Sequence, residues 1–178
     1  MAAFLDSLPP VLRRAIVAVW AAAFLGVVFV VLPREVAAWN RELGWPRWET
    51  AFGRAAGALL FAGGLGLSLY CSRLFARLGK GTPVPIDPPK ELVASGLYRF
   101  SRNPIYVAQV SILVSYFLYS GELALLGYAA VWALLVQAFV VWVEEPGLRR
   151  RFGVSYDRYT REVPRWIGIR SRRRQDVA

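Results

Sequence analysis

Four long, mostly apolar stretches divide this chain, and they constrain its fold more than any other feature. Ala15–Leu32 holds 18 residues without a charge, which corresponds to roughly 27 Å of helix against a bilayer core of about 30 Å. Further apolar runs cover Ala55–Ser72, Ile105–Ser120 and Glu122–Val143. With 56% hydrophobic residues, the chain is too apolar for an ordinary soluble domain. We predict an all-α polytopic membrane protein with about four transmembrane helices.

The first apolar run is followed by a segment rich in tryptophan. The run exceeds the usual apolar region of a signal peptide, about 7 to 15 residues, so a transmembrane helix is favoured over a cleaved signal. Pro33–Arg54 then carries Trp39, Trp45 and Trp48 among charges of both signs. This composition is typical of the lipid headgroup level, and we predict an interfacial loop. A ligand-stacking aromatic cluster is the alternative.

The remaining runs indicate how the helices pack. Ala58, Ala62 and Gly66 recur four apart, a small-residue stripe that predicts close helix packing, with room for a lipid chain as the alternative. Gly121 alone separates the third and fourth runs. So short a connection predicts an antiparallel helical hairpin.

We expect one membrane domain over residues 1–178, with the N-terminal helices in 1–72, a loop in 73–104, the hairpin in 105–145 and a cytosolic segment with a basic tail in 146–178. Gly79–Pro89 in the loop is too rich in proline to be helical, and its Gly-Lys-Gly-Thr lacks the spacing of a phosphate loop. Beyond Glu145, apolar residues recur at helical spacing. They predict an amphipathic interfacial helix, and they are Leu148, Phe152, Tyr156, Tyr159 and Val163.

The distribution of basic residues predicts the orientation. Of 22 basic residues, two lie in the N-terminal segment, six in Arg73–Arg102 and ten after the last run, against four on the other side. By the positive-inside rule, both termini are cytosolic. The net charge of +10 needs no nucleic acid, because anionic lipid headgroups suffice. Arginine outnumbers lysine and alanine is abundant, which indicates a GC-rich bacterial source and a bacterial inner membrane.

The residue types exclude several chemistries. The chain has no histidine, so a histidine base and a His-ligated metal are excluded, and we expect no metal site. Its single cysteine, Cys71, cannot form an internal disulfide, and a small buried hydrophobe is favoured over a reactive thiol. Nothing in the sequence specifies an oligomeric state.

A polar, aromatic-rich stretch, Leu92–Tyr106, stands between apolar blocks and is the candidate site. Asn103 is suited to cap a helix that begins at Pro104. The fourth run stops at Glu144 and Glu145, and two carboxylates at a helix C-terminus oppose its dipole. If the hairpin forms, both features lie at one membrane face and predict a pocket for a cationic, hydrogen-bonding cofactor. The alternative is that the glutamates pair with Arg149 and Arg150.

Three ordered elements carry a family resemblance. They are G-x-Y-x-x-x-R-N-P-x-Y from Gly96 to Tyr106, the acidic pair after a hydrophobic hairpin, and F-G-x-x-Y-x-x-Y from Phe152 followed by V-P-R from Val163. This order resembles the isoprenylcysteine carboxyl methyltransferase and phospholipid methyltransferase family of integral membrane enzymes. The likeness covers roughly Lys90–Trp166, whereas the first two helices are similar only in being hydrophobic.

The resemblance implies S-adenosyl-L-methionine bound at the cytosolic end of the hairpin, capped by the C-terminal segment, and a lipid-facing opening for a lipophilic methyl acceptor. The catalytic residues expected here are Glu145, Arg102 and Tyr106. Carried over position by position, the cofactor contacts are Lys90, Glu91, Leu92, Val93, Tyr98, Asn103, Pro104, Ile105, Tyr106 and Glu144. The expected partners are therefore the bilayer and the acceptor.

Two positions depart from the family pattern. Asn103 stands where histidine is frequent, and Val140 stands where the eukaryotic carboxyl methyltransferases have arginine, which argues against a prenylcysteine carboxylate. Phospholipid amines, lipophilic thiols or phenols, and carboxylates all stay open as acceptors. Methyl transfer from a sulfonium needs a dry pocket and correct positioning. A carboxylate acceptor needs no base, whereas an ammonium must first lose a proton, to Glu145 or to water.

Two rival functions stay open. One is a nicotinamide-dependent membrane reductase of the related sterol reductase type, although the chain shows no separate dinucleotide motif. The other is a non-catalytic membrane protein. The retained tyrosines, the Arg-Asn-Pro turn and the acidic pair favour an S-adenosylmethionine-dependent methyltransferase over both.

Overall fold

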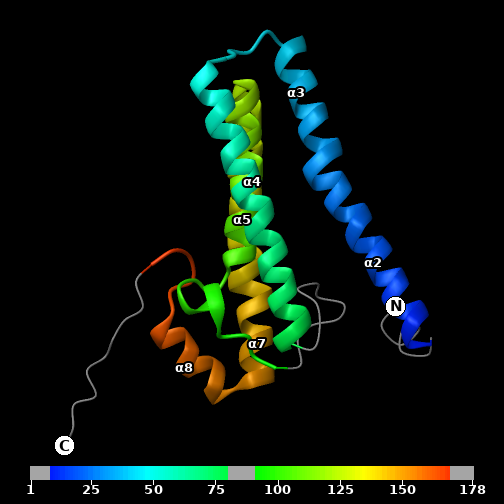
Figure 1. The fold of residues 1–178 in the computed structure, drawn as a ribbon, viewed down its shortest axis with the longest axis vertical. Coiled ribbons are helices and arrows are strands. Elements are labelled where there is room, and N and C mark those ends of the chain that lie inside the picture. Colours follow the sequence, from blue (N-terminus) through cyan, green and yellow to red (C-terminus); the bar gives the residue numbers. More distant parts are fainter. Residues whose placement is uncertain (1–8, 80–90, 169–178) are drawn as a thin grey trace, which may run out of the picture.

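The computed structural model describes residues 9–79 and 91–168, and most of this part is helical. Three helical stretches are long and apolar enough to cross a bilayer: Ala18–Glu42, Ala51–Leu78 and Leu123–Phe152. A shorter apolar helix is α5 (Pro104–Ser120). Figure 1 shows α4 and α5 side by side along the bundle, while α2 leads away from them. The predicted all-α polytopic membrane fold is confirmed, and the chain is an integral membrane protein.

The first helix is longer than predicted because it continues through Pro33. It comprises α2 (Pro10–Gly26), a π-helical turn η1 (Val27–Val31) and α3 (Leu32–Glu42). The interfacial loop predicted from Pro33 onward is therefore wrong for the part that α3 occupies. Proline is tolerated in the first turn of α3, directly after the wide π turn, because fewer backbone N–H groups are needed there.

Two tyrosines from other helices bind the π turn of the first helix. Pro33 has no N–H to donate to the preceding turn, so carbonyls of that turn need other donors. The Tyr116 hydroxyl donates to the Phe29 carbonyl at 2.7 Å, and the Tyr128 hydroxyl donates to the Val28 carbonyl at 2.8 Å. The first helix is thus joined to α5 and to the helix that follows it.

The second membrane helix packs against α5 through closely approaching backbones. Its parts are α4 (Ala51–Leu74) and the π turn η2 (Phe75–Gly79). A Cβ atom added to Gly57 would lie 2.8 Å from the Ser115 carbonyl oxygen, and one added to Gly64 would lie 2.9 Å from Ile112 Cγ1. Only glycine permits so close an approach.

The predicted small-residue stripe of α4 does not face α5. Ala58, Ala62 and Gly66 are exposed, whereas Gly57 and Gly64 are buried at a spacing of seven residues. That prediction is wrong because a helix this rich in alanine and glycine offers several small-residue faces, and only contact with a neighbour distinguishes them.

The predicted antiparallel hairpin of α5 and α6 (Leu123–Phe139) is confirmed. Gly121 makes the turn with φ of +73°, in the left-handed region that favours glycine. A Cβ atom there would also lie 2.6 Å from the carbonyl carbon of Trp48. Conformation and crowding therefore both require glycine at this position.

Buried polar residues join the first helix to this turn. Glu122 is only 2% exposed and forms an ion pair with Arg41. Asn40 is fully buried, and its Oδ1 accepts a hydrogen bond from the backbone N of Ala124 at 3.0 Å. Asn40 therefore satisfies an N–H in the first turn of α6 from a different helix.

The fourth helix does not end at the acidic pair. A π turn, η4 (Val140–Glu144), continues α6 directly into α7 (Glu145–Phe152). The expectation that two carboxylates close a helix against its dipole is therefore wrong. Pro146 lies in the first turn of α7 after the π turn, the same arrangement as at Pro33.

The C-terminal amphipathic segment is two short helices rather than one. Gly153, with φ of +49°, separates α7 from α8 (Val154–Glu162). The predicted apolar face is confirmed, because its residues form one buried cluster with a residue of the segment that precedes η3 (Gly96–Arg99). The cluster contains Tyr156, Tyr159 and Val163, with Leu92, Leu148 and Phe152 packed against it.

Candidate functional site

Glu145 binds two arginines from different segments of the chain at the end of the hairpin. Arg102, just before α5, donates from Nη1 to Glu145 Oε1 at 2.9 Å. Arg165, beyond α8, donates from Nε to Oε1 at 2.7 Å and from Nη2 to Oε2 at 3.0 Å. Glu145 is 8% exposed, and charge-assisted bonds in such a place are among the stronger ones in proteins. The hydrogen bond to Glu145 also raises the pKa of Arg165.

Glu144 has a different kind of partner. The hydroxyl of Tyr106, in the first turn of α5, donates to Glu144 Oε2 at 2.8 Å. Among the described residues no cation forms an ion pair with Glu144. The two adjacent carboxylates therefore differ: two guanidinium groups compensate the charge of Glu145, and a neutral phenol hydrogen-bonds Glu144.

Asn103 joins the start of α5 to the C-terminal segment. Its Nδ2 donates to the Arg165 carbonyl at 3.0 Å, and the backbone N of Arg102 donates to the Pro164 carbonyl at 2.9 Å. Asn103 occupies the N-cap position of α5, but its side chain makes no capping hydrogen bond. The expected capping role is therefore wrong, because the amide binds a carbonyl 62 residues away.

The segment before α5 contributes buried side chains. Val93 and Tyr98 form a buried cluster with Cys71, which agrees with the interpretation of Cys71 as a small buried hydrophobe. The Tyr98 hydroxyl is buried beside the Cys71 thiol and has no nitrogen or oxygen partner among the described residues. Glu91 is exposed, and Lys90 lies outside the described residues.

Tyrosines of α8 close one side of the site. The Tyr159 hydroxyl donates to the Tyr98 carbonyl at 2.6 Å, and the Tyr156 hydroxyl lies 3.5 Å from Arg102 Nη1. Burial raises the pKa of both phenols, more strongly for Tyr159, and Arg102 partly opposes this effect at Tyr156. Both phenols are therefore uncharged over the physiological pH range, where Tyr159 donates to the Tyr98 carbonyl and Tyr156 accepts from Arg102.

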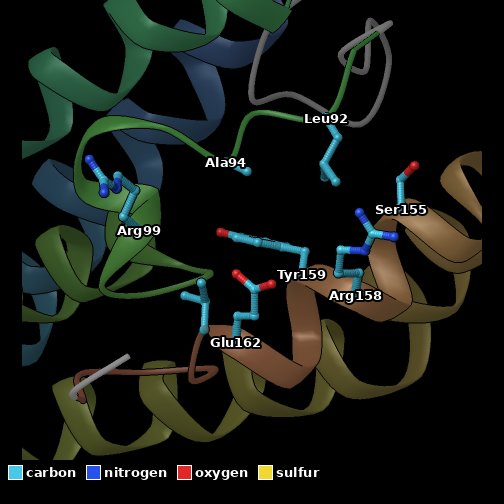
Figure 2. A pocket seen from close by; sticks show the side chains of 8 residues that line it. Leu92, Ala94, Arg99, Ser155, Arg158, Tyr159 and Glu162 are labelled. Atoms are coloured by element: carbon cyan, nitrogen blue, oxygen red, sulfur yellow. The ribbon is translucent and has the colours of Figure 1, made fainter. Parts of the chain in front are cut away.

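A cavity of about 200 Å³ adjoins this arrangement. Figure 2 shows side chains of α8, including Tyr159 and Glu162, facing the segment that carries Leu92 and Ala94. The volume is below the range of about 300–1,000 Å³ usual for ligand pockets, so the cavity fits only part of a cofactor. Its lining residues are Leu92, Ala94, Arg99, Ser155, Arg158, Tyr159, Glu162 and Val163.

The structure brings together most of the residues that the sequence singled out. Arg102, Asn103 and Tyr106 meet the acidic pair directly or through Arg165. Pro104 is buried and Ile105 packs against the Val93 cluster. Leu92 lines the cavity, and among the described residues it is the only predicted cofactor residue that does so. The alternative pairing of the glutamates with Arg149 and Arg150 is not seen, since Arg149 binds Asp157.

Sequence reasoning expected the C-terminal segment to cap the site but missed the contacts that attach it to the hairpin. Arg165 is the principal partner of Glu145, and Trp166 Nε1 donates to Gln137 Oε1 at 2.9 Å. The signal was present, because the Val-Pro-Arg motif contains Arg165. A motif alone, however, does not say which carboxylate its arginine binds.

Fold and site together define an integral membrane protein with an ion-paired polar site, where the hairpin meets the C-terminal segment. Residues 52–155 match the phospholipid methyltransferase (PEMT) family. The chain belongs to this family and is a membrane methyltransferase, as its motifs indicated. The matched region includes the acidic pair and Tyr106, whereas Arg165 lies beyond it. Comparisons with curated proteins and with solved structures gave no significant match.

Proposed function

We propose that this protein transfers a methyl group from S-adenosylmethionine to a lipophilic acceptor at the cytosolic face of the membrane. The observation that carries the proposal is the difference between the two glutamates. Glu144 hydrogen-bonds a neutral phenol and forms no ion pair with the described cations. A partly buried carboxylate of this kind is suited to a cationic ligand, and S-adenosylmethionine carries a sulfonium and an ammonium.

Two buried donors support the fit of this cofactor. Within the described part of the chain, Arg102 Nε has no hydrogen-bond partner, and the Tyr98 hydroxyl has only the Cys71 thiol, a weak partner, beside it. Unpaired buried donors are costly, and a cofactor carboxylate or ribose hydroxyl would satisfy them. The site thus offers a carboxylate to the cationic groups of the cofactor and hydrogen-bond donors to its carboxylate or hydroxyl groups.

The remaining cofactor contacts are proposed from the same segment. They are the pre-helix residues, including Lys90 and Glu91, and the first turn of α5. When bound, the cofactor supplies an electrophilic methyl group. The chain positions the reactants and excludes water, with Tyr106 orienting the Glu144 carboxylate through its 2.8 Å hydrogen bond.

The proposal changes the role expected for Glu145. Both of its oxygens are bonded to arginine, which disfavours its service as a proton acceptor. Glu145 and Arg102 therefore act as positioning residues that join the hairpin to the C-terminal segment, and an ammonium acceptor would lose its proton to Glu144 or to water.

The proposed orientation rests on charge. Eighteen of 22 basic residues belong to segments at one side of a four-helix arrangement, and Figure 1 places both ends of the described chain toward the same end of the bundle. We propose that this end is cytosolic, in a bacterial inner membrane. The acceptor would then reach the site from the bilayer.

Calorimetry on the full chain in lipid nanodiscs tests the proposal. S-adenosylmethionine should bind, and NADPH should not. Incubation with methyl-labelled cofactor and extracted bacterial lipids should then transfer label to a lipid fraction. Binding of NADPH alone, or of neither compound, would refute the proposed cofactor. Binding of S-adenosylmethionine without transfer to any lipid would refute the proposed acceptor class.

A further inference from the structure

Two buried polar atoms inside the membrane bundle lack a partner. Gln109 Oε1, in α5, can only accept a hydrogen bond, and Trp132 Nε1, in α6, can only donate one. Neither atom has a hydrogen-bond partner in the part of the chain that the structure describes. Such groups cost free energy, and the bilayer core holds no bulk water to relieve that cost. Both atoms therefore call for an explanation.

The hairpin places these two side chains at nearly the same depth in the bilayer. Gln109 precedes Gly121, the turn residue, by 12 positions, and Trp132 follows it by 11. These spacings correspond to about 18 Å and about 16.5 Å of helix, measured from the turn. Because α5 and α6 run antiparallel and pack against each other, the unpaired acceptor and the unpaired donor lie at one level of two neighbouring helices.

Helix periodicity also places both side chains on the side of the hairpin that faces the first helix. Gln109 precedes Tyr116 by seven residues, close to two full turns, and Trp132 follows Tyr128 by four. The hydroxyls of both tyrosines donate to carbonyls of the π turn η1 in the first helix. Gln109 and Trp132 therefore share the two helix faces that this turn joins.

The first helix holds the indole of Trp132 in a fixed orientation. The Phe29 ring meets it edge-on, with centroids 5.9 Å apart, and the Phe24 ring lies 6.2 Å away. Such aromatic contacts restrict how the indole can turn. The direction of its N–H is therefore set by packing against the first helix, and not by a hydrogen bond to a described residue.

The same pair of chemical groups is bonded directly elsewhere in the chain. Trp166 Nε1 donates to Gln137 Oε1 at 2.9 Å. Gln109 and Trp132 make no such direct bond, although one offers an acceptor and the other a donor. A single group satisfies both atoms only if it donates and accepts at once, as a hydroxyl does.

The burial of both atoms determines which hydroxyl fits. Gln109 Oε1 and Trp132 Nε1 are enclosed, so they leave no opening for the alkyl chain of an alcohol. Water is the smallest hydroxyl compound, and a buried water usually has two to four polar partners. Two such partners are present here.

We propose that Gln109 and Trp132 hold one water molecule between α5 and α6. The water donates to Gln109 Oε1 and accepts from Trp132 Nε1. It links the two helices of the hairpin on the side where the first helix packs, and it assigns both unpaired atoms to the stability of the bundle. The site is independent of the proposed cofactor and methyl acceptor.

Nuclear magnetic resonance on the full chain, with ¹⁵N-labelled tryptophan in detergent micelles, tests the site directly. The indole N–H signal of Trp132 is the one absent from Trp132→Phe. In the parent it should show a cross-peak to water, and Gln109→Met should abolish that cross-peak while leaving the Trp166 signal unchanged. No water cross-peak in the parent would overturn the inference and favour a direct bond between the two side chains. Persistence of the cross-peak in Gln109→Met would also overturn it.

Thermal unfolding provides a second test, because the sign of the change differs between the alternatives. Gln109→Met keeps the length of the side chain and removes the acceptor, with Gln109→Leu as the second variant. If the oxygen binds water, the melting temperature should fall, and it should fall less in a Trp132→Phe background. If the oxygen is unpaired, its removal should raise the melting temperature. Gln137→Met, which loses a direct bond, is the matched control and should lower it. An unchanged or raised melting temperature in both Gln109 variants would overturn the inference.

Discussion

Arg165 binds both carboxylate oxygens of Glu145, from Nε at 2.7 Å and from Nη2 at 3.0 Å. The two residues are 20 positions apart, with all of α8 between them. Because Arg102 binds the same carboxylate from the start of α5, three segments of the chain meet at one side chain. This relationship, more than any single helix contact, joins the C-terminal segment to the hairpin.

The Glu145–Arg165 pair should show energetic coupling. We expect Glu145→Gln and Arg165→Gln each to lower the free energy of unfolding, because each single change leaves a charged partner behind. The loss in the double variant should be smaller than the sum of the two single losses by about 1–2 kcal/mol. Thermal unfolding in detergent measures the cycle. Losses that add to within about 0.3 kcal/mol would show that the pair is not coupled.

Glu144→Gln should weaken S-adenosylmethionine binding at least tenfold, or about 1.4 kcal/mol. The change removes the charge that we assign to the cationic cofactor and keeps the size of the side chain. Tyr106→Phe is the matched control: it removes the hydrogen bond to Glu144 but keeps the charge, so its loss should be smaller. Calorimetry decides, and equal affinity in a folded Glu144→Gln protein would make the carboxylate structural.

Asn103→His should keep the link to the C-terminal segment, whereas Asn103→Ala should lose it. An imidazole N–H can replace Nδ2 as donor to the Arg165 carbonyl, and the alanine variant should be destabilised by about 1 kcal/mol. Thermal unfolding and the pH–rate profile are the measurements. A large rate gain in Asn103→His with a new titration near pH ~6.5 would instead identify this position as a base site and weaken the proposed mechanism.

Stability should fall in alkali, partly through Tyr159. Burial raises the pKa of this phenol, so above about pH 10 the unfolded chain releases a proton that the folded protein retains. The stabilising contribution is therefore complete below about pH 10 and is lost as pH rises beyond it. Near neutrality, Tyr159→Phe should have a free energy of unfolding about 1 kcal/mol lower than the parent, because its hydrogen bond to Tyr98 is lost. Between about pH 9 and 11, however, the free energy of unfolding should fall less in this variant than in the parent. If raising the pH lowers the melting temperature of both proteins by the same amount, Tyr159 does not cause the loss of stability.

The proposed orientation predicts which side each loop can be labelled from. Leu43 and Ser155 are both exposed, beyond α3 and in α8 respectively. In a Cys71→Ala background, a cysteine at position 155 should react with an impermeant maleimide only from the cytosolic side, and one at position 43 only from the opposite side. Labelling of both from one side would refute a four-crossing arrangement.

The sequence predicted what depends on local rules and on composition. Asn103 and Pro104 marked the start of α5 correctly, and Gly121 marked the hairpin turn. The spacing of Tyr156, Tyr159 and Val163 predicted the buried face of the C-terminal segment. Each of these signals rests on neighbours within a few positions, which a single sequence displays directly.

Features that depend on a second helix could not be predicted in this way. The first and fourth helices were predicted to end at Leu32 and at the acidic pair, since nothing in the sequence shows that a π turn lets each helix continue through Pro33 and Pro146. The choice of Gly57 over Gly66 as the packing glycine depends on where α5 lies. For the same reason, the partner of Glu145 was not assigned, although Arg165 stood in a quoted motif.

The binding of Tyr116 to the first helix makes two distant positions interdependent in evolution. Alanine in place of Pro33 would restore a backbone N–H, which would then compete with the Tyr116 hydroxyl for the Phe29 carbonyl. Loss of that hydroxyl would therefore be tolerated better after the proline is lost than before it. The order in which substitutions occur at these two sites thus decides which of them a lineage can accept, although the residues lie on different helices and far from the acidic pair.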